Sequence, residues 1–135
     1  MFEKMDFPQK QINKYYKAAK KDLKIAIDSN IPEVSFRFCY DALLKLAIAV
    51  CAKHGLRVKS KRGHHIALIK KLSSYLNDSE IKLLANEMRS KRNHSLYSGG
   101  ITISKKEVKE YTKWTKDIFK RANENFFNKQ QKLKL

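Results

Sequence analysis

The sequence has little of what secreted and membrane proteins depend on. Its 135 residues include only two cysteines, four glycines and two prolines. No apolar run approaches the ~20 residues that span a bilayer, because Lys45 interrupts the longest one, residues 42–52. The N-terminal sequence MFEKMD has neither the apolar core nor the small-residue cleavage site of a secretory signal peptide. We therefore expect no membrane association and a cytoplasmic location.

Motifs that identify common enzyme and metal-binding classes are also missing. The sequence has no P-loop, glycine-rich dinucleotide turn, nucleophile elbow or Cys-x-x-Cys pair. Cys39 and Cys51 fall in one predicted helix, about 18 Å apart, which is too far for a disulfide. The adjacent His64 and His65 point about 100° apart on a helix and rarely bind one ion together. We expect no metal and no cofactor, and interpret these histidines as cap or surface residues.

Acidic residues are scarce and unevenly placed. Lys and Arg total 30 against 13 Asp and Glu, a formal charge of +17. No acid occurs in residues 42–77 or 88–106, which favours a polyanionic partner such as RNA or a nucleotide. The 24 lysines, spread along the whole chain, also fit a background of general basicity. Within or beside these spans, the candidate nucleic-acid-binding residues are Arg57, Lys59, Lys61, Arg62 and Lys91.

Apolar residues make up 42% of the chain, which is enough for a hydrophobic core. They recur at the three- and four-residue spacing of helices, and no segment of useful length alternates as a strand does. The sequence predicts an all-α single domain over residues 1–127, with a frayed basic tail at 128–135. The five predicted helices cover residues 9–28, 32–54, 64–76, 77–97 with a polar cap at its start, and 104–126 with a capping box at Ser104 and Glu107.

A dense polar cluster, RSKRNHSLY, ends the fourth predicted helix. On a helical wheel with Met88 facing the core, Arg92 lies about 40° away and therefore on the buried stripe. A core-facing arginine needs an acceptor or a wet groove, because an unpaired buried charge costs several kcal/mol. Arg89, Asn93 and Tyr97 form a neighbouring ridge, while His94 falls on a different side.

The chain resembles the HEPN domain (higher eukaryotes and prokaryotes nucleotide-binding) over nearly its whole length. The features that carry the resemblance are the order of the helices, the aromatic-rich segment FRFCYDALL, the GHH entry to the third helix and the MRSKRN segment before Tyr97. The resemblance implies a five-helix, up-and-down helical bundle. It also implies a metal-independent endoribonuclease of a toxin–antitoxin or defence module, a homodimer, and a small nucleotidyltransferase as partner.

Active members of that family carry an arginine, four to six residues and then a histidine, commonly with asparagine after the arginine. Arg89 and His94 fit that spacing. Arg92 and Asn93 fit the more usual pattern, which puts Tyr97 in the position of the histidine. A tyrosine, with a pKa near 10, is a poor group for moving a ribose proton at neutral pH. The candidate catalytic residues are therefore Arg89, Arg92, Asn93, His94 and Tyr97, with Asp41 as a further assisting group.

Three functions stay open at this point. The first is a ribonuclease that uses the candidate catalytic residues. The second is a non-catalytic HEPN module that binds RNA or a nucleotide through Arg92, Asn93 and the basic segment 57–62. The third is a protein-interaction module, as a dimer or as the partner of a nucleotidyltransferase. The grouping of arginines in the two acid-free spans favours a nucleic-acid or nucleotide partner.

Overall fold

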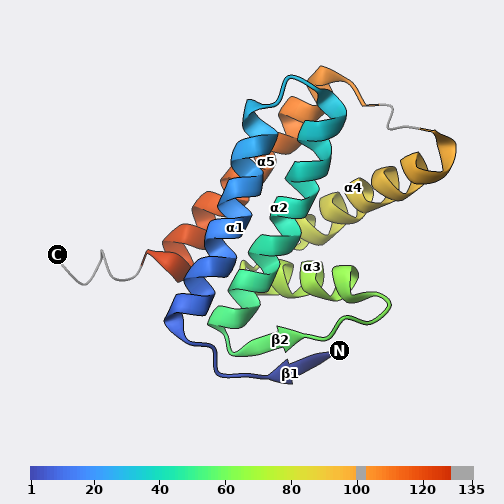
Figure 1. The fold of residues 1–135 in the computed structure, drawn as a ribbon. Helices are drawn as coiled ribbons and strands as arrows, with labels where there is room; N and C mark the ends of the chain where they lie inside the picture. Colours follow the sequence, from blue (N-terminus) through green and yellow to red (C-terminus); the bar gives the residue numbers. More distant parts are fainter. Residues whose placement is uncertain (100–102, 129–135) are drawn as a thin grey trace.

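The computed structural model describes residues 1–99 and 103–128, with the backbone alone for residues 95–98. It contains five α-helices in a single helical bundle, as the sequence predicts. Figure 1 shows α1, α2 and α5 running side by side, with α3 and α4 on the other side of α2. Of the predicted tail, residues 129–135 lie outside the described residues. No described helix is long and apolar enough to cross a membrane.

The first two helices form a hairpin. α1 (Gln9–Asp28) and α2 (Pro32–Lys53) have nearly the predicted bounds. Pro32 stands in the first turn of α2, where its missing N–H leaves no bond unmade. The hydroxyl of Ser35 donates to the Ala26 carbonyl across the turn at 2.5 Å. The hairpin therefore closes tightly, and α2 lies at the centre, in contact with each of the other four helices.

The remaining helices also follow the predicted order. α3 (His64–Tyr75) and α4 (Ser79–Ser98) are joined by a short turn. α5 (Lys105–Ala122) opens with the predicted capping box, in which Ser104 and Glu107 exchange side-chain and backbone hydrogen bonds. The last predicted turn of this helix differs from the α form, because residues 123–127 form a π-helical turn, η1 (Asn123–Phe127).

Two short strands, which no alternating pattern in the sequence indicated, accompany the five helices. β1 (Phe2–Lys4) and β2 (Leu56–Val58) pair antiparallel, with Phe2 opposite Val58. Two further backbone bonds extend the pairing, from the Lys59 N–H to the Met1 carbonyl at 2.7 Å and from the Met5 N–H to the Gly55 carbonyl at 3.0 Å. Strands of three residues are too short to show an alternating pattern, so hydrophobic periodicity could not indicate them. They fix the start of the basic segment that leads to α3.

The core is built around α2, most of whose side chains are buried. Its two cysteines are both buried, and they form no disulfide, as their spacing predicts. Burial raises the pKa of each thiol to about 11. The Cys39 Sγ lies 2.9 Å from the Thr115 Oγ1 of α5. Both thiols are therefore structural groups held in the neutral form at physiological pH.

Candidate functional site

The site with the most distinctive chemistry is a hollow between the start of α3 and the second half of α4. Its volume is about 500 Å³. Residues 60–65 line one side of it, and Arg89, Arg92 and Asn93 line the other. We call this feature the basic hollow. None of the described residues that line it is an aspartate or a glutamate.

The local fold explains why these residues meet. α3 and α4 diverge from their joining turn, so the start of α3 faces the later turns of α4 (Figure 1). Gly63 enters α3 with φ at 84°, in the left-handed region that favours glycine. It offers no side chain to cap the helix, and the first turn of α3 contains no acid. The positive end of the α3 dipole therefore lies at the basic hollow, with no acid in its own first turn to offset it.

Beneath the basic hollow, Tyr40 of α2 supports residues from both helices. The Arg92 guanidinium lies 5.6 Å from the Tyr40 ring centroid, within cation–π range. The His65 ring packs edge-on against the same ring at 6.2 Å. Tyr40 is fully buried, and its hydroxyl makes no hydrogen bond to any described residue. Arg92 is half-buried and points inward, which is the direction that the helical wheel predicts.

The electrostatics of the basic hollow act most clearly on His65. Its pKa is lowered from the ordinary 6.5, chiefly by partial burial and then by the neighbouring His64, Arg92 and Arg89. Asp41 opposes that effect more weakly. The His64 and His65 ring centroids are 4.4 Å apart. The His64 Nδ1 lies 2.8 Å from the Lys61 carbonyl oxygen, so this nitrogen carries the hydrogen and donates it.

The structure brings together about half of the candidate site residues that were predicted from the sequence. Arg89, Arg92, Asn93, Lys61 and Arg62 all line the basic hollow. His94 is exposed and is not among the lining residues. The side chain of Tyr97 lies outside the described residues, so its predicted position in the motif stays a prediction.

Two other candidate residues lie beside the β-ribbon, the antiparallel pair of β1 and β2. The Arg57 guanidinium lies 3.1 Å from a carboxylate oxygen of Glu3 on the facing strand. The Lys59 ammonium lies 4.0 Å from the other oxygen of the same carboxylate. Since one acid faces both cations, part of the positive charge on this segment is compensated before the basic hollow begins.

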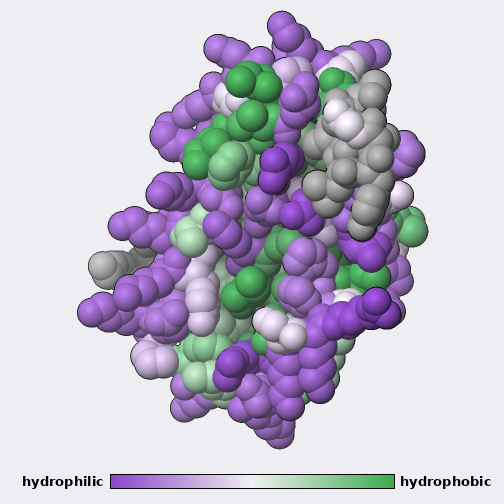
Figure 2. All heavy atoms as spheres, turned by 45° about the vertical axis from the view of Figure 1, so that its right-hand side comes forward, coloured by the Kyte–Doolittle hydropathy of each residue, from purple (hydrophilic) through white to green (hydrophobic). Residues whose placement is uncertain are grey.

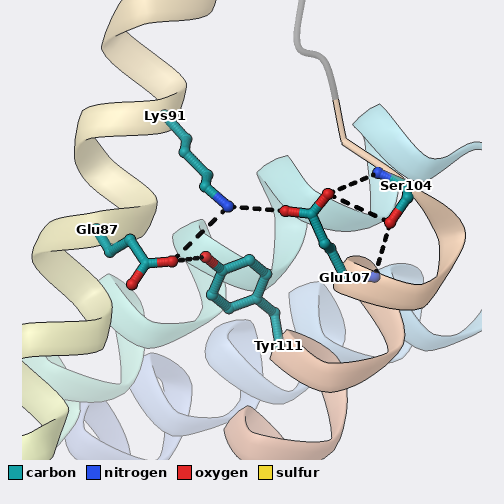
Figure 3. A network of polar contacts seen from close by, with 5 residues as sticks. All are labelled: Glu87, Lys91, Ser104, Glu107 and Tyr111. Carbon is teal, nitrogen blue, oxygen red and sulfur yellow. Dashed lines mark hydrogen bonds and ion pairs between the residues drawn. The ribbon is translucent and has the colours of Figure 1, made fainter.

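Lys91 also has acidic neighbours, on the side of α4 that faces α5 (Figure 3). Its ammonium lies 2.9 Å from Glu107 and 3.7 Å from Glu87. Tyr111 donates to Glu87 at 2.5 Å. The Glu107 hydrogen bond is the main cause that raises the pKa of Lys91. Lys91 thus joins α4 to α5, on a different face from the basic hollow.

Sequence reasoning missed His64, His65 and Tyr40 as members of this site. The available signal was the position of the two histidines directly after the basic segment 57–62, inside the longer acid-free span. Their pairing with α4 could not be read from periodicity, because it depends on how α3 and α4 diverge.

No group of three or more potential metal ligands occurs among the described residues. Comparisons with protein-family models, curated proteins and solved structures found no match.

Proposed function

We propose that this protein binds RNA through its phosphates at the basic hollow. The observation that carries the proposal is the convergence of Arg62, Arg89 and Arg92 on one hollow without an acid among its described lining residues. Guanidinium groups form paired, charge-assisted hydrogen bonds with phosphate oxygens. The uncapped start of α3 adds the positive end of a helix dipole, which also favours an anion.

RNA is the polyanion that fits the remaining features best. A hollow of about 500 Å³ has room for a phosphate together with the sugars beside it. The exposed cations Lys61 and Arg62 line the hollow on the side formed by the segment that follows β2. They extend the positive surface beyond the space that one phosphate would occupy. The resemblance to the HEPN domain supports the same class of ligand. None of the described side chains that line the basic hollow indicates base-specific recognition, so we expect binding that depends little on sequence.

The salt dependence of RNA affinity tests this proposal. Single-stranded RNA with a fluorescent label should bind, and its affinity should fall steeply between about 50 and 200 mM salt, because phosphate contacts release counterions. Three to four phosphate contacts predict a slope of roughly −2 to −3 in a plot of log affinity against log salt concentration. Fluorescence anisotropy measures this slope. No binding at low salt, or an affinity indifferent to salt, would contradict the proposal.

A second candidate function, docking of a protein partner, is favoured by a hollow at the other end of the molecule. This lysine groove, of about 560 Å³, lies between the α1–α2 turn and α5. Ala26, Ile27 and Val108 supply apolar lining. Its cations are Lys105, Lys109, Lys113 and Lys116. Figure 2 shows apolar side chains near the top of the molecule, as one of several apolar patches on a largely hydrophilic face.

Charge decides which partner fits the lysine groove. A second copy of a chain with a formal charge of +17 would be repelled there, whereas an acidic, partly apolar segment would be attracted. We therefore assign this groove to an acidic surface of a different protein, for which the HEPN resemblance suggests a small nucleotidyltransferase. A homodimer, if formed, would use another face.

Co-purification with a co-expressed small acidic nucleotidyltransferase tests this assignment. The double substitution Lys109→Glu/Lys113→Glu should abolish the complex, because like charges across an interface cost several kcal/mol. The matched control Lys14→Glu/Lys17→Glu, on exposed positions of α1, should leave it intact. A complex that survives the first variant, or that fails to form with the unmodified chain, would count against docking at the lysine groove.

A further inference from the structure

The second half of α4, which presents Arg89 and Arg92 to the basic hollow, has no apolar anchor among its described side chains. Met88 is the last buried residue of α4 that the structure describes, and residues 89–94 are all polar or charged. In Figure 1, this half of the helix leads away from α1 and α2. Polar contacts made by residues 89–94 must therefore contribute to fixing the two arginines in place.

A polar link between α4 and α5 makes such contacts, and we call it the Lys91 bridge. It consists of Glu87, Lys91, Glu107 and Tyr111 (Figure 3). The Lys91 ammonium lies 2.9 Å from a Glu107 oxygen and 3.7 Å from a Glu87 oxygen. It also lies 5.1 Å from the ring centroid of Tyr111, whose hydroxyl donates to Glu87. Ser104 holds Glu107 through the capping box, so both carboxylates beside Lys91 are themselves tied to α5 or its N-cap.

The Lys91 bridge and the basic hollow lie on different sides of the same stretch of α4. At about 100° per residue, Lys91 is about 160° from Arg89 and about 100° from Arg92 around the helix. Arg92 contacts the Tyr40 ring of α2 and Lys91 contacts α5, so α4 is restrained against rotation from two sides. We propose that the Lys91 bridge is a positioning device that keeps Arg89 and Arg92 directed into the basic hollow. This inference rests on the proposed RNA binding, and Lys91 acts through the arginines without contacting the RNA itself.

Placing the arginines in advance favours RNA binding, because side chains that are already ordered lose less conformational freedom when a ligand binds. The ion pair of the bridge is present at neutral pH. Its hydrogen bond is the main cause that lowers the pKa of Glu107 and the main cause that raises the pKa of Lys91. Both side chains are partly exposed to solvent, and ion pairs of this kind contribute modestly. We therefore expect an effect on RNA affinity that is smaller than the effect of removing the arginines themselves.

The substitution Glu107→Gln separates positioning from overall charge. Glutamine can keep the capping box at this position, but it loses the ion pair with Lys91. If only net charge mattered, removing a negative charge would strengthen the binding of RNA. The Lys91 bridge predicts the opposite. Fluorescence anisotropy with labelled single-stranded RNA should show affinity about two- to five-fold weaker than that of the unmodified chain.

Glu110→Gln is the matched control, because it makes the same change of charge at an exposed position of the same helix. This variant should bind RNA at least as tightly as the unmodified chain. The salt slope should stay the same in Glu107→Gln, because no phosphate contact is lost, whereas replacing a residue that contacts phosphate lowers the slope. An equal loss of affinity in Glu107→Gln and Glu110→Gln would overturn the inference.

Amide hydrogen exchange provides a second measurement, which needs no RNA. In Glu107→Gln, residues 89–94 should exchange faster than in the unmodified chain and in Glu110→Gln, because α4 is held less firmly. Unchanged exchange there would overturn the Lys91 bridge as a positioning device. So would RNA binding by Glu107→Gln as tight as that of the unmodified chain or tighter, and in both cases the proposed RNA binding would stand. Failure of the unmodified chain to bind RNA would overturn the proposed function and this inference together.

Discussion

Replacing Phe36 with alanine is expected to lower the free energy of unfolding by about 3–5 kcal/mol, the range for a large buried aromatic side chain. Phe36 is fully buried in α2 and packs edge-on against Tyr111 of α5, with ring centroids 5.6 Å apart. Its removal leaves a cavity where the central helix meets α5 and also removes the aromatic pair. Chemical denaturation measures the loss, which corresponds to a melting temperature lower by about 10–20 °C.

Phe38→Ala is the matched control for that substitution. Phe38 stands two residues further along α2, but it is only partly buried at the margin of the core. The same change of side chain should therefore cost less than half as much, since less apolar surface leaves water on folding. Equal losses in the two variants, or a larger loss for Phe38→Ala, would contradict the packing around α2.

The double substitution Arg89→Gln/Arg92→Gln is expected to weaken RNA binding by about 2–3 kcal/mol, or roughly 30- to 150-fold, because two charge-assisted hydrogen bonds become neutral ones. Glutamine keeps a planar group with N–H donors, but it is shorter, has two such donors in place of five and carries no charge. The salt slope should fall by about 1.4, since each lost phosphate contact on a single strand contributes about 0.7. Anisotropy titrations at several salt concentrations give both quantities.

Lys14→Gln/Lys17→Gln removes the same net charge from exposed positions on α1, a helix that packs against α2 and α5. This variant should bind RNA nearly as well as the unmodified chain. If both double variants lost affinity equally, binding would depend on the overall charge of +17 and not on the basic hollow. That result would favour the interpretation of the lysines as a general basic background, and it would contradict the basic hollow as the RNA-binding site.

The helices could be predicted from sequence because each carries its own signals. The three- and four-residue spacing of apolar side chains gave the first two helices, and the Ser104–Glu107 capping box marked the start of α5 within a residue. These signals are local. The β-ribbon joins Phe2 to Val58, residues far apart in the chain, and its three-residue strands have no local pattern to detect.

The candidate site was likewise predictable from the sequence only where the signal was local. The inward direction of Arg92 followed from its angle to Met88 on one helix, and the structure places Arg92 on Tyr40. The role of Lys91 did not follow, because its acidic partner Glu107 comes from α5. The proximity of His65 to the arginines could not be predicted from the sequence either, since it depends on the angle between α3 and α4. Charge patterns located the basic segments, but tertiary packing decided which cations remain available to a ligand.

The inert cysteines make the basic hollow accessible to site-specific spectroscopy. Both native thiols are buried, with pKa values raised to about 11, so reagents directed at thiolates should leave them unmodified in the folded protein. Ser60 is exposed at the rim of the basic hollow. A single Ser60→Cys substitution would therefore accept a fluorophore or spin label at this one position, without prior removal of Cys39 or Cys51 from the core. RNA entering the hollow could then be followed directly by a reporter at its edge.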